Sequence, residues 1–397
     1  MNRSLRAALC ALALSGCDAP SPASTQDCAA FAGPSLLSRG APASLAIVAV
    51  SPRYDAGRLR SLSLSDLSTR PLAIEATGDT VVRSLGEALG LLHRAIGEQD
   101  NLTLYQPRTG AVCQVALATD EELRASRSRP YANAHDAVAI DAGHILVTRH
   151  SMPSLAVVDV AAGRVTRTVD LSPWQGSAPL PHADAIARVG DELWVTLERD
   201  DDPTRERPTQ RGLIVRIDAR TLSVTGTITL NHPNPVGPLV PSADGRAMLV
   251  ATVGSYNDVS DGAVEAVTLA TGEVTDVVRE SDADIRGNLD AFAVVDARRL
   301  ALRVTAQRQG TAAIDDLRVV LVDLEARAEP PKLLLRMTQW GAAGPVSAGG
   351  RIFVSDPGTG FYHAGSGLRV FSPEGTELGP MLAMEPGLMP YDVQPTR

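Results

Sequence analysis

The chain has 397 residues, a formal net charge of −9, and a charged fraction of 21%. This acidic balance lacks the surplus of basic residues with which nucleic-acid-binding proteins meet phosphates, so we expect no nucleic-acid partner. Beyond the N-terminus, no apolar stretch reaches the roughly 20 residues that a membrane-spanning helix needs. The length suits two average domains or one large β domain.

The N-terminus has the order of a secretory signal. Arg3 and Arg6 precede an apolar run over residues 7–14, and Ser-Gly-Cys follows, ending at Cys17. This ending resembles a bacterial lipoprotein signal. The resemblance implies that residues 1–16 are removed as a signal peptide, that Cys17 carries the lipid, and that the protein is anchored outside the cytoplasm, at a periplasmic face or the cell surface. An ordinary secretory signal or a short membrane anchor is the alternative.

Residues 17–44 are expected to form the lipidated cysteine and a flexible tether. Proline, serine and other small residues dominate this segment, which therefore has little to bury. Phe31 and the pair Leu36-Leu37 are its apolar anchor points. Residues 45–397 are predicted to form one domain.

Two of the four cysteines are available for a disulfide. Cys10 leaves with the signal peptide and Cys17 takes the lipid, which leaves Cys28 and Cys113. An extracytoplasmic compartment permits disulfides. We therefore expect Cys28 to pair with Cys113 and to hold the N-terminal tail against the body. Two unpaired thiols, with Cys113 packed in a strand, are the alternative.

From residue 45 onward the sequence predicts short β-strands between turns. Apolar and β-branched runs are bounded by signals such as Asp244-Gly245 and Thr271-Gly272. Predicted strands include 45–50, 145–148, 155–160, 193–197, 213–217, 247–253, 319–322, 351–354 and 368–371. The only helix expected is one or two turns within 121–128, in a connector.

These strands form repeats. The segments 136–148 and 184–196 are similar, each with a loop and two further strands after it, and more units start near Asp79, Gly237, Asp290 and Gly344. Such spacing is typical of four-stranded propeller blades. Residues 45–76 supply three strands without a first one, and residues 390–393 supply the missing strand. The predicted fold is therefore all-β: a β-propeller of seven four-stranded blades, closed by pairing of the N- and C-terminal strands, with six or eight blades as alternatives.

The repeats resemble the YVTN-repeat propeller family. Ser242-Ala-Asp-Gly, Trp194-Val-Thr and Leu146-Val-Thr match its Pro-Asp-Gly and Tyr-Val-Thr-Asn elements, and Thr271-Gly272 matches its Thr-Gly turn. The resemblance spans residues 45–394 and implies the fold. It implies little about function, because such propellers bind, scaffold and in some cases catalyse.

Aspartates near the starts of the innermost strands are the candidate ligands. Aligned blades place Asp79, Asp136, Asp184, Asp290 and Asp392 together, with His135 and His182 close by. Carboxylates at one channel mouth suit a hard divalent cation such as calcium, although no cofactor is certain. The alternative is structural, because aspartate commonly closes turns through backbone hydrogen bonds.

Loops after the second strands supply further candidate binding residues. They include Arg149-His150, the mixed-charge loop 200–211, residues 256–258, and the loop 356–363 with its aromatic residues. No catalytic motif is present, and the catalytic residues are unknown. We therefore expect a lipid-anchored binding or scaffold module for a protein, glycan or small ligand. The alternatives are a metal-dependent hydrolase or lactonase with a cation at the central channel, and a periplasmic redox role.

Overall fold

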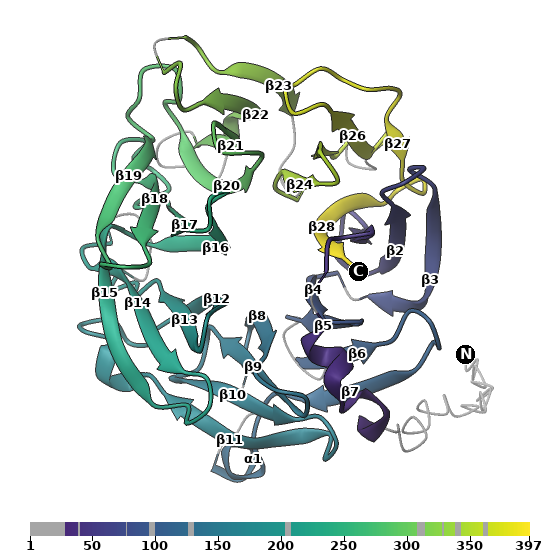
Figure 1. Cartoon of the computed structure of the whole chain (residues 1–397), viewed down its shortest axis with the longest axis vertical. Coiled ribbons are helices and arrows are strands. Elements are labelled where there is room, and N and C mark those ends of the chain that lie inside the picture. The colour runs from purple at the N-terminus through teal and green to yellow at the C-terminus, as the bar shows by residue number, and fades with distance from the viewer. Residues whose placement is uncertain are drawn as a thin grey trace, which may run out of the picture.

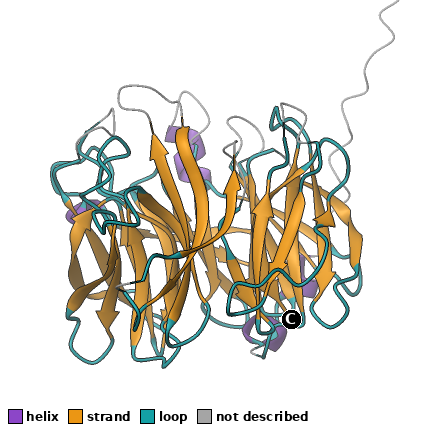
Figure 2. Ribbon diagram, turned by 90° about the horizontal axis from the view of Figure 1, so that it is seen from above, coloured by secondary structure: helices purple, strands orange, loops and turns teal. Residues whose placement is uncertain are grey.

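The computed structural model describes residues 28–38, 40–76, 78–94, 100–125, 131–202, 208–307, 314–327, 329–337, 343–359 and 364–397. The signal peptide and Cys17 lie outside these residues. Within them, the strands form seven antiparallel sheets of four strands each, arranged in a ring. Figure 1 looks along the axis of this ring, and Figure 2 shows it from the side. The seven-bladed propeller predicted from the repeats is confirmed.

Blades are numbered here from the one that contains β1, and each is given from its innermost to its outermost strand. Blade 1 contains β28 (Met389–Thr396), β1 (Ser44–Val50), β2 (Gly57–Ser63) and β3 (Thr69–Ala76). Blade 2 contains β4 (Thr80–Leu85), β5 (Ala88–His93), β6 (Asn101–Tyr105) and β7 (Val112–Ala116). Blade 3 contains β8 (Ala134–Ala139), β9 (His144–Arg149), β10 (Ser154–Asp159) and β11 (Arg164–Asp170). Blade 4 contains β12 (Ala183–Val189), β13 (Glu192–Leu197), β14 (Arg211–Asp218) and β15 (Val224–Pro233).

The remaining three blades follow in chain order around the ring. Blade 5 contains β16 (Pro235–Pro241), β17 (Ala247–Thr252), β18 (Ala263–Thr268) and β19 (Val274–Arg279). Blade 6 contains β20 (Asn288–Val294), β21 (Arg299–Gln307), β22 (Ile314–Asp323) and β23 (Lys332–Met337). Blade 7 contains β24 (Val346–Ala348), β25 (Arg351–Asp356), β26 (Gly367–Phe371) and β27 (Leu382–Ala383). Strands β28, β4, β8, β12, β16, β20 and β24 surround the central channel (Figure 1).

Blade 1 closes the ring with strands from both ends of the domain. The C-terminal strand β28 pairs antiparallel with β1, from Ser44 opposite Thr396 to Val50 opposite Met389. Val393 is buried within the apolar cluster between blades 1 and 7. This pairing completes blade 1 and closes the ring. Ring closure is how a propeller protects its sheet edges. The predicted closure is confirmed.

Among the described residues, helical structure is found in connectors and in residues 28–38. The one α-helix among the described residues is α1 (Asp120–Ala125), within the connector where the sequence predicted a turn or two. The 3-10 turns are η1 (Cys28–Phe31), η2 (Pro34–Leu37) and η3 (Ser172–Trp174). Within the described part of the chain, no helix combines the length and apolar character that crossing a membrane requires.

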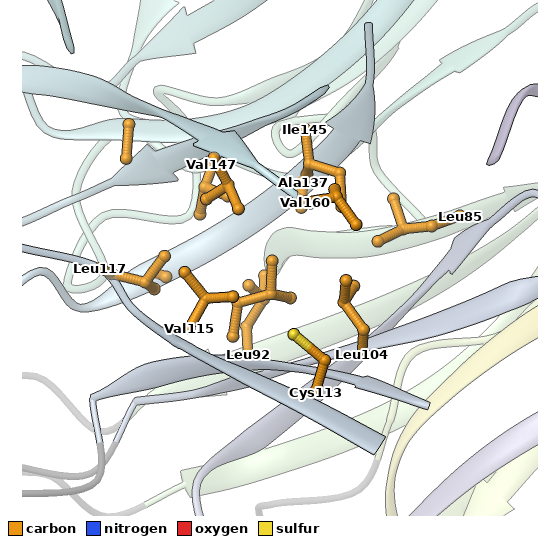
Figure 3. Close-up of a cluster of buried hydrophobic side chains, with 14 of the residues drawn as sticks. Leu85, Leu92, Leu104, Cys113, Val115, Leu117, Ala137, Ile145, Val147 and Val160 are labelled. Carbon is orange, nitrogen blue, oxygen red and sulfur yellow. The ribbon is translucent and has the colours of Figure 1, made fainter. Parts of the chain in front are cut away.

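The N-terminal segment packs against blades 2 and 3. Residues 28–38 belong to the segment expected to be a tether, yet Cys28, Phe31 and Leu36 are buried in the apolar cluster that these blades share. A disulfide joins Cys28 to Cys113 of β7, with the Cα atoms 5.0 Å apart. Figure 3 shows Cys113 within this cluster, near Leu92 and Leu104. Any free tether therefore ends before residue 28.

Candidate functional site

Several polar side chains of the channel lie at β-bulges in the inner strands. In β8 the register with β9 shifts between Ala134 and Ala137, which places His135 and Asp136 at the bulge. Equivalent shifts place Asp184 in β12, Asp290 in β20 and Tyr391 in β28 at bulges. A bulge redirects a side chain away from the regular alternation of a strand and is frequent beside binding sites. Three of the five predicted aspartates, Asp136, Asp184 and Asp290, therefore lie at bulges, whereas Asp392 follows one and Asp79 precedes β4.

The repeated Val-Thr element supports these bulges. A bulge leaves one backbone N–H without its ladder partner, and burying that group unpaired is costly. The backbone N–H of Asp136 donates to Oγ1 of Thr148 at 2.8 Å, and the backbone N–H of Ala185 donates to Oγ1 of Thr196 at 2.9 Å. The threonines that carried the family resemblance thus have a structural role at the site.

Four of the five predicted aspartates line a cavity of about 460 Å³ in the channel, named here the channel cavity: Asp136, Asp184, Asp290 and Asp392. Arg83 on β4 lies between two of them, with its Nε 2.5 Å from Asp136 and its Nη1 3.0 Å from Asp392. Arg303 contacts Asp290 at 2.6 Å. Asp136, Asp290 and Asp392 are thus already matched by guanidinium groups, so a calcium ion would have to compete with arginine for them.

Part of the aspartate role is structural, as the alternative interpretation held. One carboxylate oxygen of Asp136 accepts the backbone N–H of Ile186 from blade 4 at 2.9 Å. A carboxylate oxygen of Asp392 accepts the backbone N–H of Val82 from blade 2 at 2.7 Å. The aspartates therefore connect neighbouring blades. Whether any of them also binds a cation stays a prediction.

The charge states around the channel follow from burial and pairing. Burial alone would lower the pKa of Arg83, but Asp136 and Asp392 raise it above its usual value, so this side chain is always a cation. Burial lowers the pKa of His135, and its hydrogen bond with Asp184 only partly opposes this effect. At neutral pH, His135 is therefore an uncharged imidazole.

A second hollow of about 540 Å³ lies at one mouth of the channel and is named here the vestibule. Its lining consists of Tyr54, Asp79, Arg94, Tyr131, Asn133, His135, His150 and Tyr391. The fifth predicted aspartate, Asp79, thus lies here and not in the channel cavity. Arg94, His135 and Tyr391 line both hollows. The vestibule and the channel cavity are therefore adjacent and share these three side chains.

Hydrogen bonds fix the polar wall of the vestibule. Arg94 contacts Asp79 at 2.6 Å and the hydroxyl of Tyr391 at 2.8 Å, and that hydroxyl donates to Asp79 at 2.7 Å. The hydroxyl of Tyr131 donates to the backbone carbonyl of Arg94 at 2.5 Å. Burial raises the pKa of Tyr391, and Asp79 raises it further although Arg94 opposes, so its phenol stays neutral. The wall is rigid and holds both donors and acceptors.

A cluster of imidazoles and one carboxylate lies at the floor of the vestibule. His135, His150 and Glu198 each offer one donor atom, and these atoms lie within 4.8 Å of one another. The rings of His135 and His150 are stacked, with centroids 4.5 Å apart. Nε2 of His150 lies 3.2 Å from a carboxylate oxygen of Glu198. The predicted candidate His182 is adjacent, with its ring centroid 4.9 Å from that of His150.

Three side chains at or beside the vestibule occupy the same position in consecutive blades. Arg94, His150 and Glu198 each follow the second strand of their blade directly. The backbone N–H of each donates to the carbonyl of a residue just before the inner strand: Asp79, Asn133 and His182 respectively. The side chains are therefore directed alike around the channel. The position after the second strand therefore carries a guanidinium in blade 2, an imidazole in blade 3 and a carboxylate in blade 4.

The sequence argument missed part of this site. It named Arg149-His150 as a loop candidate but did not identify Arg94, Glu198 or the tyrosines. Aligning the residue after each second strand would have revealed Arg94 and Glu198. The tyrosines come from unrelated places, Tyr54 from a hairpin of blade 1 and Tyr131 from the connector before β8, so no local signal joins them. Arg149 itself is fully buried and contacts Glu122 of α1 at 2.8 Å.

The described residues of the other predicted loops are not part of the vestibule lining. Asp200 to Arg211 and Asp356 to His363 are described only in part, and residues 361–363, with the predicted aromatic contact surface, lie outside the described residues. The backbone carbonyl of Tyr256 accepts the side-chain amide of Asn288 at 3.0 Å, which joins that loop to blade 6. His182 does not contribute to the lining of the vestibule either.

Comparisons with known proteins support the fold alone. No protein-family model matches the sequence. No curated protein matches it either. A solved structure described as a "putative 6-phosphogluconolactonase" from Bacteroides fragilis is 12% identical, with a TM-score of 0.56, over 89% of this chain and 98% of that one.

Two further solved structures are similar at the same level. One, from Bacteroides uniformis and given the same description, is 11% identical with a TM-score of 0.57, over 89% of this chain and 99% of that one. A "hypothetical selenium-binding protein" from Sulfolobus tokodaii is 10% identical with a TM-score of 0.55, over 92% and 96% of the two chains. At such identities the likeness concerns architecture, and function must be argued from the site.

Proposed function

We propose that this propeller is a lipid-anchored extracytoplasmic protein that binds a small polar ligand in the vestibule. The observation that carries the proposal is the vestibule itself: a hollow of about 540 Å³ whose tyrosines, imidazoles and guanidinium converge at the mouth of the channel. A concave site with aromatic walls and a few fixed polar groups is the usual form of a small-molecule site.

The lining favours a hydroxylated ring compound, such as a sugar or a sugar acid. Tyr54 and Tyr391 meet edge to face with centroids 5.5 Å apart, so the two phenols offer flat surfaces at a steep angle to one another. Arg94 supplies a cation beside the carboxylate of Asp79. Phenol faces suit the apolar face of a sugar ring, while the guanidinium and hydroxyls suit its oxygen atoms.

The anchoring part of the proposal rests on the sequence. The lipoprotein-like signal ends at Cys17, and the first described residues, 28–38, pack beside blades 2 and 3. Replacement of Cys17 by serine is expected to abolish lipidation and leave the protein soluble or unprocessed. A mature-sized Cys17→Ser protein that still partitions into detergent would contradict the anchor. Membership of the YVTN-repeat family belongs to the proposal as well.

The binding proposal is tested by titrating the full chain with glucose, gluconate and δ-gluconolactone in a calorimeter. We expect saturable binding of at least one probe. Tyr54→Ala should weaken it at least fivefold, about 1 kcal/mol, because an aromatic contact is lost. Leu378→Ala is the matched control, since both side chains are exposed and Leu378 is outside the vestibule lining. Absence of binding, or equal weakening in both variants, would contradict the proposal.

A second candidate is hydrolysis of a lactone in the same vestibule. It is favoured by the buried His150–Glu198 pair, because a carboxylate that orients an imidazole is a common general-base arrangement. Two structurally similar proteins carry the description "putative 6-phosphogluconolactonase". Turnover of δ-gluconolactone above the uncatalysed rate, lost in His150→Gln, would favour the enzyme. Binding without turnover would favour the binding protein.

A further inference from the structure

We propose that His135, His150 and Glu198 bind one divalent transition-metal ion, and that zinc is the best match. Two imidazoles and one carboxylate form a ligand set that zinc uses where it keeps a position open for water or a ligand. This metal site differs from the predicted calcium site, since it uses nitrogen donors and only one carboxylate. It does not depend on the identity of the vestibule ligand.

The spacing of the three donors is close to that of a metal site. Ligand atoms about 2 Å from a tetrahedral zinc ion lie about 3.3 Å from one another. Nε2 of His150 and the oxygen of Glu198 are already 3.2 Å apart, and all three donor atoms fall within 4.8 Å. Small rotations of the side chains would bring the third donor into range.

A carboxylate orients the first of these histidines. Nδ1 of His135 lies 2.5 Å from Asp184, and this carboxylate comes from the neighbouring blade. Metal-binding histidines almost always donate their other ring N–H to a carboxylate or carbonyl, which fixes the ring and its tautomer. The contact directs Nε2 of His135 away from Asp184 and makes it the free donor. Asp184 is thus placed as a positioning residue.

The fold presents this cluster to a ligand. His135 and His150 belong to the vestibule lining, whereas Glu198 lies behind them and is 3% exposed. An ion held by the three would therefore have its protein ligands on one side and the vestibule on the other. The same repeat position that gives Arg94 in blade 2 gives His150 and Glu198 in blades 3 and 4, so the metal site spans two blades.

The test is a zinc titration of the full chain, purified in detergent after chelator treatment, in competition with a chromophoric chelator. We expect one zinc ion per chain. Glu198→Gln, which preserves shape, and His150→Ala should each weaken binding by at least about tenfold, and Asp184→Asn by about 10- to 100-fold. Substitution with cobalt(II) should give visible absorption bands of a four- or five-coordinate ion, and these bands should be lost in Glu198→Gln.

His144→Ala is the matched control, because His144 is a histidine of the same blade that contacts a carboxylate, Asp141, at 2.9 Å on the surface. Its zinc affinity should be that of the wild type. A wild type that binds no zinc would overturn the proposal, and so would zinc binding that is unchanged in both Glu198→Gln and His150→Ala. Because sugar titrations are run on the zinc-free protein, failure of this site and failure of the vestibule proposal are separate results.

Discussion

Buried acidic side chains have different partners in two sectors of the ring. In blades 1 to 4, which surround the vestibule, three carboxylates of the channel cavity face a guanidinium or an imidazole: Arg83 contacts Asp136 and Asp392, and His135 contacts Asp184. In blade 5 and directly after its last strand, Glu265 and Glu280 are fully buried and accept hydrogen bonds from backbone amides, and Glu265 also accepts one from the hydroxyl of Thr252. Asp290 of blade 6, which faces Arg303, resembles the first group.

Both arrangements connect blades, but their chemistry differs. Glu265 of β18 accepts the backbone N–H of Asn231 in blade 4 at 2.7 Å, and Glu280 accepts that of Leu289 in blade 6 at 2.9 Å. Burial raises the pKa of Glu280 to about 9, so its carboxyl is neutral at pH 7. The first sector, by contrast, holds fixed charges beside an open hollow. A ligand or ion is therefore expected in blades 1 to 4, around the vestibule. Glu265 and Glu280 are expected to have a structural role only.

The largest effect is expected from deleting residues 389–397. This removes β28, the inner strand of blade 1, and with it Tyr391 of the vestibule and Asp392, the partner of Arg83. Because ring closure is a long-range contact, its loss exposes the inner edge of β1 and should be felt in every blade. We expect a large fall in melting temperature or aggregation. An unchanged melting curve would contradict the closure by β28.

The next largest effect is expected from Arg83→Met. The substitution keeps much of the apolar stem but leaves Asp136 and Asp392 as buried carboxylates without their cation, which costs about 3–5 kcal/mol of unfolding free energy. Arg108→Met is the control, since the exposed pair of Arg108 and Glu87 should contribute about 0–1 kcal/mol. Denaturant unfolding measures both. Equal losses would show that the vestibule sector has no special dependence on its ion pairs.

Unlike Arg83→Met, Glu280→Gln should make the protein more stable relative to the wild type as the pH rises. The carboxyl of Glu280 has a pKa of about 9 in the folded chain against 4.5 for the ordinary group, so the folded state holds its proton more tightly. Its contribution to stability is present below pH 4.5 and is lost as the pH rises toward 9. The variant, which cannot ionise, should lose less stability than the wild type over this window.

Unfolding followed at several pH values between 5 and 9 measures this difference. Glu377→Gln provides a control, because Glu377 is exposed and contacts Arg369 at 3.0 Å. If Glu280→Gln and the wild type show the same pH dependence of stability, the carboxyl of Glu280 is not held neutral by burial. The proposed difference between the two sectors would then fail.

The smallest effect is expected for calcium on the channel aspartates. Because Asp136 and Asp392 share Arg83, and Asp290 faces Arg303, calcium has to displace arginine to bind there. Calorimetry with calcium should give much less heat than zinc, and Asp136→Asn combined with Asp290→Asn should change it little. Strong calcium binding that this double variant abolishes would restore the aspartate ring as the principal cation site.

The sequence predicted the architecture well because propeller blades repeat. Periodic strands and the Val-Thr elements indicate a blade wherever they occur, and the unpaired strand at each terminus indicated closure. The site was predicted only in part. Asp136 and Asp184 recur at the repeat, but a bulge shifts which neighbour each side chain meets, and bulges leave no clear signal in one sequence. The vestibule tyrosines come from a hairpin, a connector and the strand β28, and only folding brings them together.

The most direct test of the account is a crystal structure of the protein grown with zinc and gluconate, with anomalous diffraction measured at the zinc edge. The account predicts one strong anomalous peak among His135, His150 and Glu198, and ligand density in the vestibule beside Tyr54 and Arg94. A metal peak among the channel aspartates, or ligand density confined to blades 5 and 6, would contradict it.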